Sequence, residues 1–303
     1  MNFIQTGNSG KNDWWLYVFT VLIVMLGTQI GSIPLMIVAF FKAGDTQTFY
    51  NAALDNFGSL NINKNLYLIL MLLTFIIGFI LLLFCVKYLH KKTTTSIITS
   101  RKKIDWKRFF FGVFTWGIIS VITITLGIIL SPESYEWNFK AGPFFTLLLI
   151  SVLLIPTQTS LEELLFRGYL MQGFGLLSKS PFFALVLTST IFGLLHLSNP
   201  EVAKVGNWIM VYYIGTGFFF GIVTLMDKGT ELALGMHAIN NILASVFVTA
   251  NWTVFHTDAL FIDYAEPSLG IDTFLPVIVL YPLLIVVFAK KYKWTNWREK
   301  LIG

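Results

Sequence analysis

The chain has 303 residues, of which 55% are hydrophobic and 12% are charged, with a formal net charge of +5. Soluble globular proteins carry about 25% charged residues, and several apolar runs here reach the roughly 20 residues that cross a bilayer. These values exclude a soluble enzyme and a nucleic-acid-binding domain, and the single cysteine, Cys85, excludes a disulfide scaffold.

The hydropathy pattern predicts an all-α polytopic membrane protein with eight membrane helices. The expected spans are Trp14–Phe41, Leu66–Val86, Phe109–Leu130, Pro143 to about Leu176, Phe182–Leu197, Trp208–Met226, Leu232–Ala250 and Phe274–Ala289. The seventh is the least hydrophobic, because His237, Asn240, Asn241 and Ser245 lie within it. Since all loops are short, we expect one membrane domain over residues 1–303, with any activity built from the membrane helices themselves.

The basic residues predict the orientation of the chain in the membrane. Lysine and arginine concentrate in residues 87–108, between the second and third spans, and in residues 290–300, after the eighth. Basic loops usually lie in the cytoplasm, and eight spans place both regions there only if both termini are also cytoplasmic. We therefore expect a multi-pass protein of the cell membrane, whose partner is the lipid bilayer and no nucleic acid.

A first group of ionisable residues lies in the fourth span, at Glu162, Glu163 and Arg167. Ionisable groups within a bilayer are costly, which makes each a functional-site hypothesis. On a helix, Glu163 and Arg167 are four residues apart and can form an ion pair on one face. Glu162 is rotated by about 100° and is left available for chemistry. The alternative is a helix-end pair that reaches into interfacial water.

Two further groups contain histidine. His196 lies near the end of the fifth span, where a histidine often has only a structural role. His237 and Asn241 are four residues apart and share one face of the seventh span, where an asparagine can also hold helices together. Together with Glu162, these groups supply what hydrolysis needs: a base for water and donors for the oxyanion. The same atoms are ordinary zinc ligands. His90 and His256 are expected to be structural.

At these residues the sequence resembles the CAAX prenyl protease type II and bacteriocin-processing (CPBP, or Abi) family of membrane proteases. The family motifs are a Glu-Glu pair with Arg four positions after the second Glu, then Phe-x-x-x-His, then His-x-x-x-Asn or Asp. They occur in this order at Glu162-Glu163 with Arg167, Phe192 with His196, and His237 with Asn241. The resemblance covers about residues 143–250, and the eight-span architecture agrees with it.

The resemblance implies an intramembrane endopeptidase. Carried over by position, Glu162 activates the attacking water with help from His196, and His237 and Asn241 stabilise the oxyanion. Glu163, Arg167 and Phe192 support the site. The family is often labelled as metalloprotease, and a metal-free, glutamate-dependent mechanism has also been argued for it. A zinc site made by Glu162, His196 and His237 is chemically sound. The sequence lacks a His-Glu-x-x-His motif, and we slightly favour the metal-free site.

Bringing these groups together places a requirement on the fourth helix. Simple counting puts Glu162 and His237 towards the cytoplasmic half of the membrane and His196 towards the opposite face. They converge only if the fourth helix continues past Arg167, so that Glu162 sits deeper. We therefore predict a continuous helix from about Thr146 to Gly173.

Two other functions are compatible with the sequence. A member of the same family without catalysis would act as an immunity or scaffold membrane protein, although its motifs are intact here. A transporter can also use membrane-embedded carboxylates and histidines, but the repeated halves or paired broken helices typical of transporters are not evident. For a protease, the expected substrate is a membrane-bound or lipid-modified peptide, either prenylated or bacteriocin-like.

Overall fold

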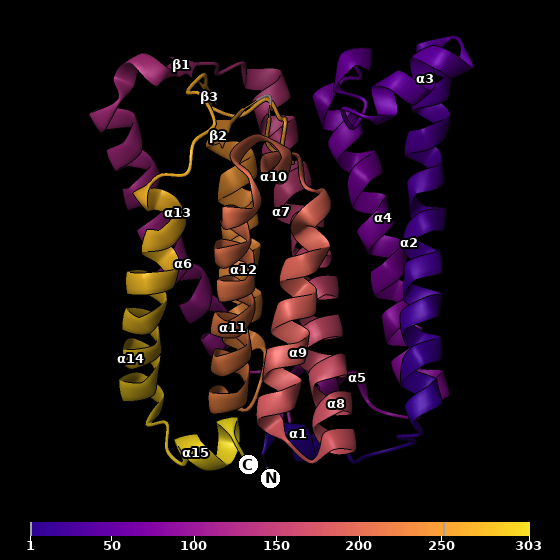
Figure 1. Ribbon diagram of the computed structural model, residues 1–303, viewed down its shortest axis with the longest axis vertical. Coiled ribbons are helices and arrows are strands. Elements are labelled where there is room, and N and C mark those ends of the chain that lie inside the picture. Colours follow the sequence, from indigo (N-terminus) through magenta and orange to yellow (C-terminus); the bar gives the residue numbers. More distant parts are fainter. Residues whose placement is uncertain (1, 251) are drawn as a thin grey trace.

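The computed structural model describes residues 2–250 and 252–303, which are mostly helical (Figure 1). The longer helices are α2 (Trp14–Ala43), α4 (Lys64–Phe84), α6 (Trp106–Leu130), α7 (Ala141–Glu163), α9 (Pro181–Leu194), α11 (Met210–Asp227), α12 (Glu231–Val246) and α14 (Tyr281–Tyr292). The short ones are α1 (Phe3–Thr6), α3 (Thr46–Ala53), α5 (Thr94–Ile98), α8 (Met171–Ser178), α10 (Pro200–Val205), α13 (Ile271–Leu275) and α15 (Trp297–Leu301). Three strands, β1 (Tyr135–Trp137), β2 (Val248–Thr249) and β3 (Phe261–Asp263), form a small sheet in the order β1-β3-β2.

The predicted all-α polytopic membrane fold is confirmed. Within the described residues, seven helical segments are long and apolar enough to cross a membrane, and they coincide with the predicted spans other than the seventh. The seventh span was predicted to end at Ala250, and this is wrong: α12 has only 16 residues and ends at Val246. The chain leaves the helix there because Val248 and Thr249 pair with β3.

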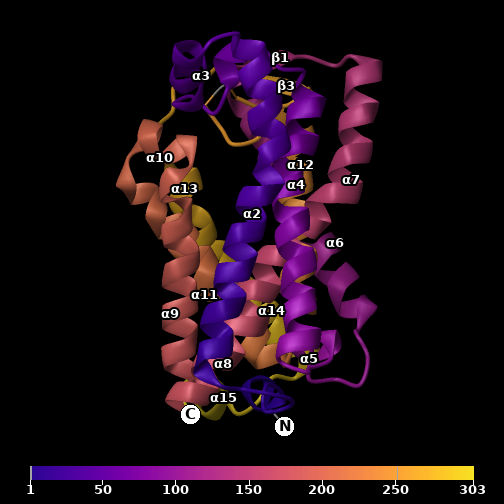
Figure 2. The same cartoon turned by 90° about the vertical axis from the view of Figure 1, so that its right-hand side faces the viewer.

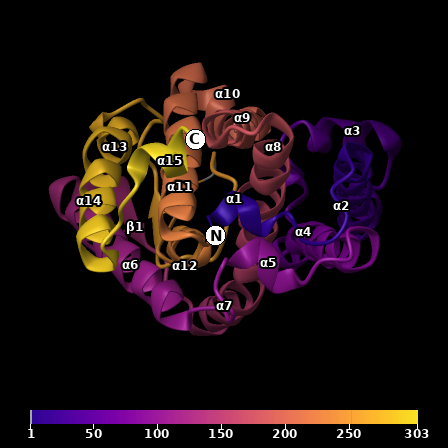
Figure 3. The ribbon, with the colours of Figure 1, turned by 90° about the horizontal axis from the view of Figure 1, so that it is seen from below.

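The helices form a bundle in which α12 is enclosed by its neighbours. Helices α2 and α4 lie side by side at one edge, α6 and α14 lie at the other, and α7, α9, α11 and α12 lie between them (Figures 1 and 3). Figure 2 shows the small sheet and α3 at one end of the bundle and both termini at the other. The burial of α12 explains why it needs less apolar surface than a lipid-facing span.

Two glycines set α12 close to α6. A Cβ atom on Gly112 of α6 would lie 2.5 Å from the carbonyl oxygen of Leu232, and one on Gly235 of α12 would lie 2.1 Å from the carbonyl oxygen of Phe109. Contacts this short are impossible for a side chain, so only glycine allows the two backbones to touch. Small residues at helix crossings in membranes commonly have this role, and here they fix the position of the helix that holds His237.

The fourth span is continuous, as predicted. Helix α7, a π-helical segment (Leu164–Leu170) and α8 together form one span of 38 residues, Ala141–Ser178. The π-helical turns begin directly after Glu163. Such segments are uncommon and occur frequently at functional sites.

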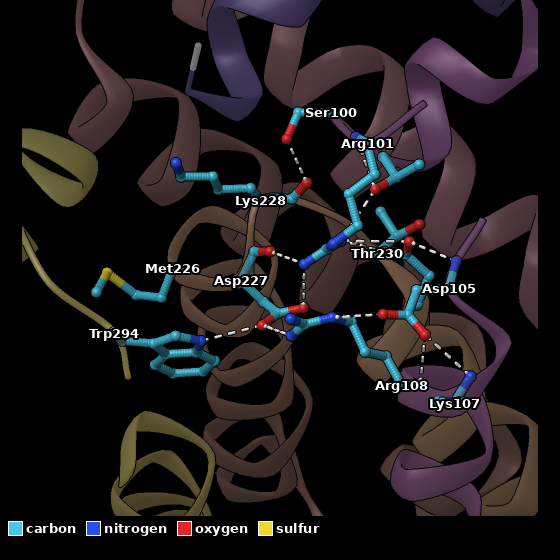
Figure 4. Close-up of polar contacts among 12 residues, drawn as sticks. Ser100, Arg101, Asp105, Lys107, Arg108, Met226, Asp227, Lys228, Thr230 and Trp294 are labelled. Atoms are coloured by element: carbon cyan, nitrogen blue, oxygen red, sulfur yellow. Dashed lines mark hydrogen bonds and ion pairs between the residues drawn. The ribbon is translucent and has the colours of Figure 1, made fainter. Parts of the chain in front are cut away.

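Charged residues hold together the end of the bundle at which the termini lie (Figure 4). Asp227, the last residue of α11, is buried and accepts hydrogen bonds from Arg101 at 3.0 Å and from the indole of Trp294 at 3.0 Å. It also forms an ion pair with Arg108. Glu231, at the start of α12, pairs with Arg101 at 3.1 Å. Ion pairs thus connect the basic loop before α6 to α11 and α12. A hydrogen bond from Trp294 connects the chain after α14 to α11.

A second buried polar cluster at the same end contains His90 and Lys92. His90 donates from Nδ1 to the carbonyl oxygen of Lys11 at 2.8 Å and lies 2.6 Å from the hydroxyl of Tyr169. The Nζ atom of Lys92 donates to Asn12 at 2.7 Å and to the hydroxyl of Tyr17 at 3.1 Å. Burial lowers the pKa of Lys92 to about 8.

This lowered pKa predicts how stability depends on pH. The unfolded Lys92 titrates near pH ~10.4, so between about pH 8 and pH 10 the unfolded chain binds more protons than the folded one. Stability must then rise with pH in this window. We expect the melting temperature of the wild type to rise between these pH values relative to that of Lys92→Met. Lys103 is exposed and supplies the control. If Lys103→Met changed the pH dependence of the melting temperature as much as Lys92→Met does, the effect could not be assigned to Lys92.

Candidate active site

The two adjacent glutamates of α7 point in different directions. Glu163 is fully buried and accepts a hydrogen bond from Arg167, with 3.0 Å between Oε1 and Nη1. This is the ion pair that the four-residue spacing predicts. The side chain of Glu162 keeps 18% of its surface exposed and lines a cavity. One carboxylate is therefore part of the packed helix bundle, and its neighbour is accessible to a substrate.

His237 of α12 lies between both glutamates. Its Nδ1 atom is 2.8 Å from Oε1 of Glu163, and its Nε2 atom is 3.4 Å from Oε2 of Glu162. Because a carboxylate paired with arginine only accepts hydrogen bonds, the Nδ1 atom must carry a proton. The buried Glu163 therefore fixes the imidazole so that Nε2 faces Glu162.

One ring nitrogen of His196 is hydrogen-bonded, and the other has no hydrogen-bond partner among residues 2–250 and 252–303. Its Nδ1 atom is 2.8 Å from the carbonyl oxygen of Phe192, so it must donate there. The ring stacks on Tyr213 with 4.4 Å between centroids. The ring of Phe192 also lies 3.9 Å from the guanidinium of Arg167 and contacts His237 edge-on. Phe192 thus connects the fifth span to the buried ion pair, and the Nε2 atom of His196 keeps its lone pair.

A chain of side-chain hydrogen bonds ends on Glu162. Trp116 donates to Asn240 at 2.9 Å, Asn240 donates to Asn241 at 3.0 Å, and Asn241 donates to Gln158 at 3.1 Å. Gln158 in turn donates to Oε1 of Glu162 at 2.6 Å. Each of the three amide side chains in this hydrogen-bond network accepts one hydrogen bond and donates one. The orientation of Glu162 therefore depends on that of Asn241.

Most of these residues line one cavity of about 280 Å³, close to the lower limit of roughly 300 Å³ for small-ligand pockets. Of the residues expected from the sequence, Glu162, Phe192, His196, His237 and Asn241 line it. Glu163 and Arg167 are fully buried and do not line the cavity. The continuous fourth helix therefore brings Glu162 into the same cavity as His196.

Two comparisons with known proteins identify relatives of the chain. The family model described as Type II CAAX prenyl endopeptidase Rce1-like matches residues 141–243. The "Uncharacterized protein YyaK" of Bacillus subtilis (strain 168) is 31% identical over 258 residues, which are 84% of this chain and 85% of the relative. The chain belongs to the Rce1-like family. No solved structure matches the chain.

The part of the chain matched by the Rce1-like model includes all residues from Gln158 to Asn241, and thus both glutamates and both histidines. It begins with α7 and ends within α12, so it covers the helices that hold both glutamates and both histidines. The family assignment and the cavity thus point to the same helices, although the relative YyaK is itself uncharacterised.

The residues that were expected to share a zinc ion are not arranged as a metal site. Within residues 2–250 and 252–303, no three histidine, cysteine, aspartate or glutamate side chains are placed so that they could hold a metal ion together. Glu162 is instead bonded to an amide, and Glu163 and His237 are bonded to each other.

Gln158 and Glu201 are among the cavity residues that sequence reasoning missed. Gln158 precedes Glu162 by four residues, the spacing that places two side chains on one helix face, and a polar residue in an apolar span could have drawn attention to it. Glu201 lies outside the spans, in α10, where an acidic residue is ordinary. Only the folded chain shows that it reaches the cavity.

Proposed function

We propose that this protein is an intramembrane endopeptidase that hydrolyses a peptide bond in a membrane-associated substrate, either prenylated or bacteriocin-like. The observation that supports this most directly is the position of Glu162. Its carboxylate lies on the cavity wall, is held by Gln158 at 2.6 Å and faces Nε2 of His237. Membership of the Rce1-like family supports the same class of activity.

In the proposed reaction, Glu162 is the general base. It takes a proton from a water molecule, whose oxygen attacks the carbonyl carbon of the scissile bond. His196 orients this water, because the lone pair of its Nε2 atom is available to accept a hydrogen bond. When the C–N bond breaks, the proton on Glu162 passes to the departing amine, so the carboxylate is restored.

The negative charge on the carbonyl oxygen needs donors that are already in place. His237 supplies one from Nε2 when that atom is protonated, and Glu163 stabilises the resulting positive charge through Nδ1. Asn241 supplies the other: its amide donates one N–H to Gln158, and an amide has a second N–H to give. Arg167 holds Glu163 in place through an ion pair of 3.0 Å.

We propose that the protein lies in the cell membrane with both termini in the cytoplasm. The basic loop 87–108 and the basic residues 290–300 support this orientation, because both lie at the end of the bundle with the termini. The cavity extends away from that end, towards α10 and the loop after β2. A substrate would therefore reach Glu162 from the outer half of the membrane.

The experiment that tests the function uses purified protein in lipid nanodiscs. A quenched farnesylated peptide and an unmodified membrane peptide of the same sequence are offered, and new N-termini are identified by mass spectrometry. We expect cleavage of at least one peptide, and we expect it to continue in the presence of a chelator. Cleavage that stops with the chelator and returns with zinc would replace the metal-free mechanism. Binding of both peptides without cleavage would favour a scaffold protein.

Gln158 is expected to contribute to catalysis by positioning Glu162. Gln158→Leu keeps a similar volume and removes both hydrogen bonds, to Glu162 and from Asn241. A hydrogen bond to a charged group is worth about 1.5–3 kcal/mol, so we expect kcat to fall roughly 10–100-fold with little change in KM. Gln172 is the matched control: it is buried and bonded to the carbonyl oxygen of Ser96 at 2.8 Å, outside the cavity. An equal fall of kcat in Gln172→Leu would show a general structural effect.

A further inference from the structure

We propose that the outer end of the cavity is a subsite for a positively charged group of the substrate and that Glu201 recognises it. The inference builds on the proposed function, because it takes the occupant of the cavity to be a peptide. It names the chemical class of one substrate residue, a lysine or an arginine.

The cavity extends well beyond the residues assigned to catalysis. Asn199 and Glu201, which follow α9, line its outer end together with Val254 and Phe255 from the loop after β2. In Figure 1, α10, which contains Glu201, lies in the half of the bundle away from the termini. A peptide bound across Glu162 would thus place one of its side chains among these outer residues.

Glu201 is held in place but has no charged partner in the part of the chain that the structure describes. Its Oε1 atom accepts a hydrogen bond from the backbone N–H of Val254 at 2.9 Å. Its Oε2 atom is buried and has no hydrogen-bond partner within the described residues. Lys204, on the same short helix, lines a separate hollow with Trp252 and Asp263. Burial raises the pKa of Glu201, because a carboxylate with an unpaired buried oxygen is unfavourable.

The walls of the cavity favour a cation. Among the described residues that line it, none is a lysine or an arginine, whereas two are glutamates, Glu162 and Glu201. Almost half are aromatic, including Tyr212, Tyr213 and Phe255, whose ring faces attract an ammonium or guanidinium group. The charge of a carboxylate is shared by both of its oxygens, so Glu201 attracts such a group while Oε1 stays hydrogen-bonded to Val254.

The outer subsite lies close to the reacting centre. Asn199 donates to the hydroxyl of Tyr213 at 3.3 Å, and the ring of Tyr213 stacks on His196. Asn199, which lines the outer end of the cavity with Glu201, thus contacts the tyrosine that stacks on the histidine that orients water. We expect the basic residue of the substrate to lie near the scissile bond rather than many residues away from it.

The test measures peptide binding by a catalytically inactive variant. Glu162→Gln protein in nanodiscs is titrated against fluorescein-labelled nine-residue peptides of alanine and leucine, in which a single lysine is moved through the sequence. Each peptide has a twin with norleucine in place of lysine. At one position we expect the lysine peptide to bind at least about tenfold more tightly than its twin, as a hydrogen-bonded charge pair typically gives.

Adding Glu201→Gln should remove this difference, because glutamine keeps an oxygen for the Val254 N–H and loses the charge. Glu266→Gln is the matched control, since Glu266 is an exposed carboxylate that lines the separate hollow with Lys204. The proposal is overturned if lysine is preferred at no position, or if the preference survives in Glu201→Gln. If the lysine preference depends on Glu201 but the wild type cleaves none of the peptides, the subsite stands and the proposed hydrolysis fails.

Discussion

Replacement of Glu162 by glutamine is expected to lower kcat by about a thousandfold or more. Glutamine has almost the same shape as glutamate and can still accept the 2.6 Å hydrogen bond from Gln158, so the fold and the cavity should be preserved. It cannot take a proton from water. The loss should therefore appear in kcat, with substrate affinity largely unchanged.

The measurement compares single-turnover cleavage of the peptide by the wild type and the variant, with binding determined separately by fluorescence. Glu133→Gln provides the control, because Glu133 is an exposed carboxylate that does not line the cavity. Turnover by Glu162→Gln within tenfold of the wild type would rule out Glu162 as the base. A fall in binding as large as the fall in kcat would instead indicate a role in holding the substrate.

The contacts that follow helical periodicity were predictable from the sequence. Glu163 and Arg167 are four residues apart on one helix, and the spacing alone indicates their ion pair and the divergence of Glu162. The same holds for His237 and Asn241, which both line the cavity. Within a bilayer each such polar residue stands out, because its energetic cost is high and its neighbours are apolar.

Contacts between helices could not be predicted from the sequence. The spacing shows that His237 and Glu163 face inwards, but not that they meet at 2.8 Å. Their distance depends on where α12 lies relative to α7, and the position of α12 is fixed in part by its close contact with α6, where Gly112 and Gly235 meet backbone far away in the sequence. The early end of α12 has a similar cause, since pairing with β3 replaces the last helical turn.

Replacement of Arg167 by methionine is expected to destabilise the protein by about 3–5 kcal/mol, because removing one partner leaves the other charge buried without compensation. Both side chains of the pair are fully buried, and their atoms are 3.0 Å apart. The free energy of unfolding in detergent is the quantity to measure. Arg298→Met is the control, since Arg298 is exposed at the start of α15, and it should change stability by less than about 0.5 kcal/mol.

A second substitution separates the role of this pair in stability from its role in the site. In the Arg167→Met background, Glu163→Gln removes the uncompensated charge, so part of the lost stability should return. Activity should not return, because His237 then lacks the carboxylate that holds its Nδ1 proton at 2.8 Å and stabilises its charged form. Such a variant would be folded, bind substrate and turn over slowly. If the two substitutions instead destabilise additively, the two residues are not coupled, and the buried pair does not hold the site together.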